Sequence, residues 1–289
     1  MLAAGVLGIS PFLLKRVYLA GAGAVVSKSI GPVPRDGNKN PVIVGTDCGL
    51  LNSMGLPNPG VDEFIKELEK LEGSNIPIIA SIFGSNVEEF ELVAKKITRL
   101  SIIKAIEINI SCPHSEISQI GQDPNLTEMI VKRVRDIVNL PLFVKLTPNV
   151  TNVVEIGKSA EKAGADALTA INTVRAMAID VETAYPILNN IYGGLSGPAI
   201  KPISIRIVYD LYKSVKIPII GVGGIKSWED VIEYFYAGAS AVQIGWGFIQ
   251  YDMDIFYKIL KGLLEFLDRK KINNIQELTG KTHNILSKS

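Results

Sequence analysis

Short runs of apolar, often β-branched residues alternate along the chain with longer segments in which apolar residues recur every three or four positions. The short runs are almost continuously apolar, which is typical of strands that are buried on both faces of a sheet. They predict strands at Met1–Ala4, Ala24–Ser27, Ile76–Phe83, Ala105–Ile110, Leu142–Thr147, Ala167–Asn172, Ile217–Val222 and Ala241–Gly245.

The longer segments predict amphipathic helices between these strands. Asn86 and Ser227 each stand where a residue caps a helix, and Asp230 completes a capping box with Ser227. Gly164 and Gly238 each follow a predicted helix, where a left-handed residue commonly ends it. The clearest helices are predicted at Val87–Leu100, Leu126–Val138, Val153–Ala163, Ile203–Ser214, Ser227–Ala237 and Asp254–Asp268.

The repeated order of strand, helix and strand implies a parallel sheet. Eight such strands favour a closed (β/α)8 barrel (the TIM barrel of the α/β class) over an open, doubly wound sheet. A chain of 289 residues fits a single barrel domain over residues 1–289, and no linker or repeat interrupts it. Residues 29–60 are rich in Gly, Pro and Asn and are expected to be a long irregular loop, which in a compact domain is usually functional.

Net charge and amino-acid composition exclude several classes of function. The net charge is +1 and no long basic run occurs, which argues against nucleic-acid binding. No apolar stretch approaches the roughly 20 residues that span a bilayer. Two cysteines suit neither a disulfide framework nor an iron–sulfur cluster, and two distant histidines make a zinc site implausible. We expect a cytoplasmic protein with reduced thiols, no bound metal and, if it is redox-active, an organic cofactor.

Polar residues and glycines gather where the predicted strands end. In a (β/α)8 barrel the catalytic residues lie at this rim. Buried lysine and asparagine side chains are costly unless they are paired, so several of them on one rim indicate a site, although any single one can simply hold a loop. In chain order these residues are Lys28, Ser29, Asn109, Cys112, Lys145, Asn172, Thr173, Gly223, Gly224 and Gly245.

Cys112 follows a buried strand in the sequence Asn-Ile-Ser-Cys-Pro-His. A free cysteine is often only a small buried apolar residue. Here Pro113 cannot donate to a strand ladder, and the polar segment from His114 to Pro124 resembles a lid. A thiol with an ordinary pKa of about 8.5 is a serviceable base, so Cys112 is a candidate for proton transfer. His114 either tunes that thiol or is a solvated loop residue, and Cys48 has no chemical neighbours in sequence and is interpreted as structural.

Gly223 and Gly224 follow the seventh predicted strand and precede a helix that begins near Ser227. Backbone N–H groups at such a place can cradle a phosphate, and (β/α)8 barrels often bind phosphate after strands seven and eight. Gly245, after the eighth strand, permits a second close approach of the backbone. The glycines therefore predict a ligand that carries phosphate.

Several segments together resemble the dihydroorotate dehydrogenases of class 1, most closely the B-type catalytic subunit. The resemblance covers nearly the whole chain and implies an FMN-containing (β/α)8 barrel that oxidises dihydroorotate to orotate in pyrimidine synthesis. The segments that carry it are Gly21–Ser29, Asn52–Gly60, Asn109–Pro113, Lys145–Thr151, Ile171–Pro202, Gly221–Ile225 and Gly238–Gly245.

The resemblance also implies roles for single residues. Cys112 matches the base that removes a proton from C5 of the substrate while a hydride leaves C6 for flavin N5. The residues that match substrate contacts are Lys28, Asn52, Ser53, Met54, Gly55, Leu56, Asn109, Asn172 and Thr173. The residues that match FMN contacts are Ala4, Lys28, Ser29, Asn109, Lys145, Ile171, Gly197, Gly223, Gly224, Gly245 and Trp246.

The chain departs from the family pattern at three positions. Ser81 stands where an asparagine that contacts FMN is common, which puts that contact in doubt. Trp246 stands where a small residue usually follows the phosphate-binding glycine, so its backbone can serve only if its side chain points away. His114 replaces an asparagine that many members carry.

Two other functions stay open at this point. His114, Gly121–Pro124 and Lys145–Val150 also resemble the flavin domain of dihydropyrimidine dehydrogenases, which act on uracil and thymine, whereas Arg175–Asp180 and Gly193–Pro202 favour dihydroorotate. The other alternative is a barrel that binds a phosphate ligand without redox chemistry.

The electron acceptor does not follow from these residues. A homodimer is expected. The B-type resemblance implies in addition a heterotetramer with a separate subunit that carries FAD and an iron–sulfur cluster and passes electrons to NAD. The A-type alternative is a homodimer that uses fumarate.

Overall fold

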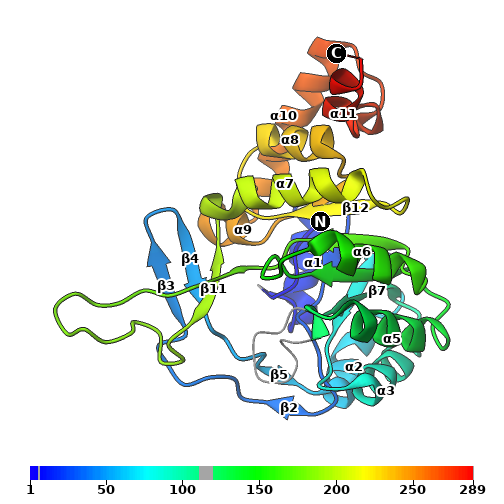
Figure 1. Ribbon diagram of the computed structural model, residues 1–289. Coiled ribbons are helices and arrows are strands. Elements are labelled where there is room, and N and C mark those ends of the chain that lie inside the picture. The colour runs from blue at the N-terminus through cyan, green and yellow to red at the C-terminus, as the bar shows by residue number, and fades with distance from the viewer. Residues whose placement is uncertain (6, 111–119, 289) are drawn as a thin grey trace.

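The computed structural model describes residues 1–5, 7–110 and 120–288. Its centre is a parallel sheet of seven strands in the order β1-β6-β7-β8-β9-β12-β13 (Figure 1). The strands are β1 (Val25–Val26), β6 (Ile78–Ile82), β7 (Ile103–Asn109), β8 (Leu142–Leu146), β9 (Ala167–Ala170), β12 (Ile219–Val222) and β13 (Ala241–Gln243).

Leu2 closes this sheet into a barrel. It forms parallel bridges with Val25 of β1 and with Ile244, which follows β13, and β1 and β13 are the two edges of the sheet. The Ala3 N–H donates to the Ile244 carbonyl at 2.9 Å on one side, and the Leu2 N–H donates to the Ala24 carbonyl at 3.1 Å on the other. The predicted first strand is thus reduced to a bridge, but it occupies the eighth position and the (β/α)8 barrel is confirmed.

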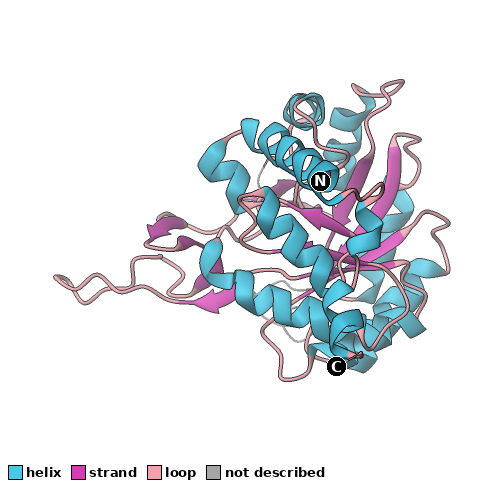
Figure 2. Cartoon of the chain, turned by 90° about the horizontal axis from the view of Figure 1, so that it is seen from above, coloured by secondary structure: helices cyan, strands magenta, loops and turns pink. Residues whose placement is uncertain are grey.

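Helices surround the barrel (Figure 2), and all six predicted ones form. The side chain of Asn86 caps α3 by accepting from the Glu89 N–H at 2.9 Å, and Ser227 and Asp230 form the expected capping box. α5 and α7 begin two residues earlier than predicted because proline is tolerated in the first turn of a helix. The α-helices are α1 (Pro11–Leu19), α2 (Val61–Glu69), α3 (Val87–Ile97), α5 (Pro124–Arg135), α6 (Val153–Lys162), α7 (Lys201–Tyr212), α8 (Trp228–Ala237), α9 (Trp246–Tyr251), α10 (Asp254–Lys270) and α11 (Lys281–Leu286), with 3-10 turns η1 (Pro198–Ile200) and η2 (Ile275–Leu278).

Alternation along the strands divides the buried residues into two layers. On β7, Ile106 and Ile108 belong to the large apolar core between the sheet and the helices. Ala105 points the other way and joins Val26 and Ile79 in a small cluster inside the barrel. Further along the strands the inward positions become polar, so the barrel interior is apolar where the strands begin and polar where they end.

The sequence predicted an irregular loop over residues 29–60, but this segment forms four short strands. β2 (Pro34–Arg35) pairs with β5 (Asn58–Pro59), and β3 (Ile43–Thr46) and β4 (Gly49–Asn52) join an antiparallel sheet of order β10-β11-β4-β3 with β10 (Val174–Ala176) and β11 (Gly193–Ser196). This sheet projects from the barrel in Figure 1. The prediction was wrong because these strands are short and contain Gly, Pro and Asn, and because β4 pairs with β11, which is far away in the sequence.

Within the residues that the structure describes, no helix has the length and apolar character needed to span a membrane.

Candidate functional site

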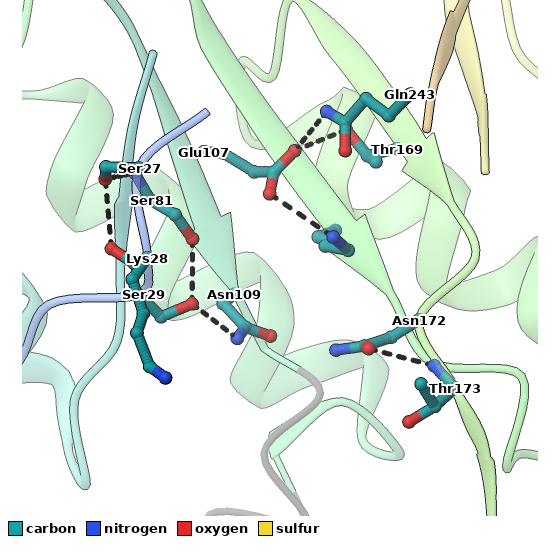
Figure 3. A network of polar contacts seen from close by, with 11 residues as sticks. Ser27, Lys28, Ser29, Ser81, Glu107, Asn109, Thr169, Asn172, Thr173 and Gln243 are labelled. Atoms are coloured by element: carbon teal, nitrogen blue, oxygen red, sulfur yellow. Dashed lines mark hydrogen bonds and ion pairs between the residues drawn. The ribbon is translucent and has the colours of Figure 1, made fainter. Parts of the chain in front are cut away.

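Polar side chains from three barrel strands converge where those strands end (Figure 3). Ser29, which follows β1, shares a hydrogen bond of 2.9 Å with the Ser81 hydroxyl of β6. The Asn109 amide at the end of β7 donates to the Ser29 hydroxyl at 3.0 Å. The Ser81 N–H in turn donates to the Ser27 hydroxyl at 3.0 Å. These contacts fix Ser29 and Asn109, and they make Ser81 a buried support for both.

Lys28 lies in the same region, beside this serine network in Figure 3. The residue is only 7% exposed. Burial lowers the pKa of its ammonium, because the charged form loses solvation. A buried cation interacts more strongly with an anion than an exposed one does, since there is less water to screen it. Lys28 therefore suits a ligand that carries a carboxylate.

Asn52 and Thr173 both contact Gly194, although Asn52 ends β4 and Thr173 lies between β9 and β10. The Asn52 amide donates to the Gly194 carbonyl at 3.2 Å. A Cβ on Gly194 would lie 2.0 Å from the Thr173 hydroxyl oxygen, so only glycine fits between them. The Thr173 N–H donates to the Asn172 side-chain oxygen at 2.9 Å. The antiparallel sheet thus joins the predicted contacts on β4 to those that follow β9.

The segment from Ser53 to Leu56 follows β4. The Asn38 side chain donates to the Ser53 carbonyl at 2.8 Å, and the Asn38 N–H donates to the Met54 carbonyl at 3.0 Å. Gly55 and Leu56 both have positive φ, at 76° and 56°. The buried Ser53 hydroxyl has no hydrogen-bond partner among the described residues. A buried polar group without a protein partner suits a contact to a ligand.

Three glycines lie close together, Gly197 directly after β11 and Gly223 and Gly224 in the turn after β12. Gly197, Gly223 and Gly224 have φ values of 103°, 140° and 65°. A Cβ on Gly224 would lie 2.7 Å from the Gly197 carbonyl oxygen, so any side chain at position 224 would force the backbone to shift. The Tyr234 hydroxyl donates to the Gly223 carbonyl at 2.7 Å, and burial raises the pKa of that hydroxyl. The turn is therefore held from below and offers bare backbone above, which fits a phosphate group.

Gly245 and Trp246 lie next to this turn. The indole of Trp246 lies 3.2 Å from the Cβ position of Gly197 and packs edge-on against Tyr251, with ring centroids 6.2 Å apart. A Cβ on Gly245 would make only an ordinary contact of 3.5 Å, with Ala3. The Trp246 side chain thus packs against Gly197 and Tyr251. This packing is compatible with the predicted contact between the Trp246 backbone and FMN.

Lys145 belongs to a buried polar cluster that sequence reasoning missed. We call Glu107, Lys145, Thr169 and Gln243 the Glu107 cluster. One Glu107 oxygen, Oε2, accepts from the Thr169 hydroxyl at 3.0 Å and from the Gln243 amide at 2.7 Å. The other, Oε1, lies 3.7 Å from the Lys145 ammonium. The signal was present in the sequence: an acidic residue inside an otherwise apolar strand requires a buried partner.

The remaining predicted residues are less informative. Ile171 is buried, and its N–H donates to the Val222 carbonyl at 3.0 Å. Ala4 packs against the small apolar cluster inside the barrel. Cys48 is exposed in the turn between β3 and β4. Cys112 and His114 lie outside the described residues.

Comparison with known proteins bears directly on this site. A sequence model described as dihydroorotate dehydrogenase matches residues 1–267. Curated relatives named dihydroorotate dehydrogenase B (NAD(+)), catalytic subunit, include one from Methanosarcina acetivorans that is 50% identical, over 99% of this chain and 93% of its own length. The relatives from Methanocaldococcus jannaschii and Pyrococcus furiosus are 50% and 47% identical, over 98% and 97% of this chain and 93% of their own lengths. Since the match spans every strand of the barrel and its polar rim, this chain belongs to the dihydroorotate dehydrogenase family.

Proposed function

We propose that this protein catalyses the FMN-dependent oxidation of dihydroorotate to orotate in pyrimidine biosynthesis. The observation that carries the proposal is one rim that combines a buried cation, Lys28, with the amides of Asn109 and Asn172 and a glycine turn suited to phosphate. Membership of the dihydroorotate dehydrogenase family, whose chemistry is flavin-dependent, supports the same reaction. The alternative of a phosphate-binding barrel without redox chemistry leaves the buried lysines unexplained.

The residues of the rim fit FMN. Gly197, Gly223 and Gly224 offer backbone at a turn that no side chain can enter, which suits the phosphate. Buried polar groups suit the ring system, and those of the Glu107 cluster include acceptor oxygens without a hydrogen-bond partner among the described residues. When bound, FMN would supply the hydride acceptor. The residues that would hold it are Ala4, Lys28, Ser29, Asn109, Lys145, Ile171, Gly197, Gly223, Gly224, Gly245 and Trp246.

The chain's own residues would bind and orient the substrate. The Lys28 ammonium attracts the substrate carboxylate. Asn52, Asn109 and Asn172 each carry both a donor and an acceptor, which suits the imide edge of the dihydroorotate ring. Ser53 and Thr173 complete the wall on the side of the antiparallel sheet, together with the backbone of Met54, Gly55 and Leu56.

Cys112 would act as the base. Its thiolate takes the proton from C5 while a hydride leaves C6, so that a double bond forms between the two carbons. The proton and the hydride leave different carbons, and this requires the base and the hydride acceptor to be held at fixed positions around the ring. Lys145 would stabilise the negative charge that develops on the reduced cofactor.

The test is a reduction experiment under anaerobic conditions. We expect purified protein loaded with FMN to be yellow and to bleach when dihydroorotate is added, because the bound flavin is reduced. In the comparison experiment, uracil or thymine is added to protein whose flavin has been reduced beforehand. If the reduced flavin rapidly reduces uracil or thymine, and dihydroorotate does not bleach the oxidised flavin, the protein is instead a dihydropyrimidine dehydrogenase. Protein that cannot be loaded with FMN would contradict the proposal.

We further propose that electrons leave through a second protein in the cytoplasm. The relatives are named catalytic subunits of NAD(+)-dependent enzymes, and this chain has only two cysteines, too few for an iron–sulfur cluster. The partner would carry FAD and that cluster, in a heterotetramer built on a dimer of this chain. Co-purification from the native source, followed by iron analysis, is expected to find iron in the complex. An iron-free homodimer that is oxidised by fumarate would show the A-type arrangement instead.

A further inference from the structure

The Glu107 cluster lies inside the barrel, directly below the rim. Glu107 and Gln243 are fully buried, as is Thr169, and Lys145 is 4% exposed. Figure 3 shows Glu107, Thr169 and Gln243 pointing toward one another from β7, β9 and β13. Asn109 lies two residues further along β7 and pairs in register with Lys145. The cluster therefore stands one layer beneath residues that are proposed to contact both substrate and cofactor.

The two oxygens of Glu107 have different surroundings. Two neutral donors hold Oε2, at 3.0 and 2.7 Å, and so fix the orientation of the carboxylate. Oε1 makes no hydrogen bond to a described residue and faces the Lys145 ammonium at 3.7 Å. This distance permits charge attraction but exceeds that of a normal hydrogen bond. The carboxylate thus attracts the ammonium without taking up its protons, which remain for a group on the other side.

The Glu107 carboxylate compensates the charge of the buried Lys145 ammonium. A buried cation is costly unless an anion compensates it, and removing one partner leaves the other uncompensated. With Glu107 present, the pair contributes little net charge to the barrel interior. Without it, the Lys145 charge would act in full on any ligand above the cluster, since screening is weak in a buried site.

We propose that Glu107 is a positioning residue that fixes the Lys145 ammonium beneath the flavin and limits the positive charge offered to the reduced cofactor. The inference rests on the proposed function, because it requires FMN to bind above the cluster. Thr169 and Gln243 hold the carboxylate in place and contribute no charge. Glu107 thereby adjusts how readily the bound flavin accepts electrons.

Glu107→Gln tests this most directly, because the amide oxygen can keep both bonds from Thr169 and Gln243 and only the group that faces Lys145 changes. We expect the ratio of affinities for reduced over oxidised FMN to rise at least tenfold, which is about 30 mV for a two-electron couple. The measurement is the midpoint potential of the bound flavin, by spectroscopic titration against a reference dye. Thr169→Val is the matched control, since it removes one hydrogen bond but no charge, and its ratio should stay within threefold of the wild type.

Glu107→Asp provides a second variant in case Glu107→Gln does not fold. It keeps the charge but withdraws the carboxylate from Lys145, so the ratio should rise at least threefold in the same direction. A purely structural role would weaken both redox states of FMN equally, and unchanged potentials in the Glu107 variants would overturn the inference. Wild-type protein that binds FMN but is not bleached by dihydroorotate would instead overturn the proposed function and leave the potentials of the variants measurable.

Discussion

Replacing Cys112 with alanine is expected to slow the reduction of bound flavin by dihydroorotate by about 10²- to 10⁴-fold, the usual contribution of a general base. The C5 proton would have no acceptor, whereas the hydride acceptor would still be in place. FMN should remain bound, because Cys112 is not among the residues proposed to hold it and most of those residues come from other strands. Stopped-flow absorbance of the flavin, under anaerobic conditions, measures the rate.

Cys48 offers a matched control for this variant. It is the only other cysteine of the chain, and it is exposed in the turn between β3 and β4. In the Cys48→Ala variant, dihydroorotate should therefore reduce the bound flavin at the wild-type rate. If Cys112→Ala also stays within a few-fold of the wild type, another group removes the proton and the assignment of Cys112 is wrong.

Replacing Gly224 with alanine is expected to weaken FMN binding at least tenfold. Its φ of 65° lies in the left-handed region, which costs a non-glycine residue about 1–2 kcal/mol. The added Cβ would also lie 2.7 Å from the Gly197 carbonyl oxygen and 2.9 Å from the Lys201 Cβ. The turn must shift to relieve these contacts, and the backbone that fits the phosphate shifts with it. Titration of FMN fluorescence gives the dissociation constant.

Two other glycines separate an effect on FMN from an effect on the fold. A Cβ on Gly45 meets no atom within 4 Å, so Gly45→Ala should change neither stability nor FMN binding. A Cβ on Gly245 makes only an ordinary contact, so Gly245→Ala should fold normally yet obstruct the approach of the phosphate. Wild-type FMN affinity in both the Gly224 and the Gly245 variant would exclude a phosphate site at these turns.

The barrel was predictable because its signals are local. Each strand is a short apolar run, and caps such as Asn86 lie within three residues of the N–H groups they accept from. The antiparallel sheet was not predictable in this way, since Asn52 pairs with Gly194 across much of the chain. Its strands have only three or four residues, most of them partly exposed, and three of the four contain glycine, so they show neither an apolar run nor clear alternation.

Much of the candidate site was predictable for a different reason. In a parallel barrel the end of each strand is a known place, so polar residues such as Lys28, Asn109 and Lys145 could be assigned to one rim from strand order alone. Glu107 was missed because it lies within a strand rather than at its end. Only the structure brings Thr169 and Gln243 to its carboxylate, from strands more than sixty residues away along the chain.

The bridge at Leu2 bears on how the chain avoids aggregation while it folds. Leu2 can pair with Val25 early, but it meets Ile244 only after most of the chain has been synthesised, so the sheet keeps open edges until then. Unpaired edges are templates for association with other chains, and short edges reduce that hazard. β1 has two residues and β13 has three, which makes them the shortest strands of the sheet. The barrel therefore closes along the two edges that offer a foreign strand the fewest backbone partners.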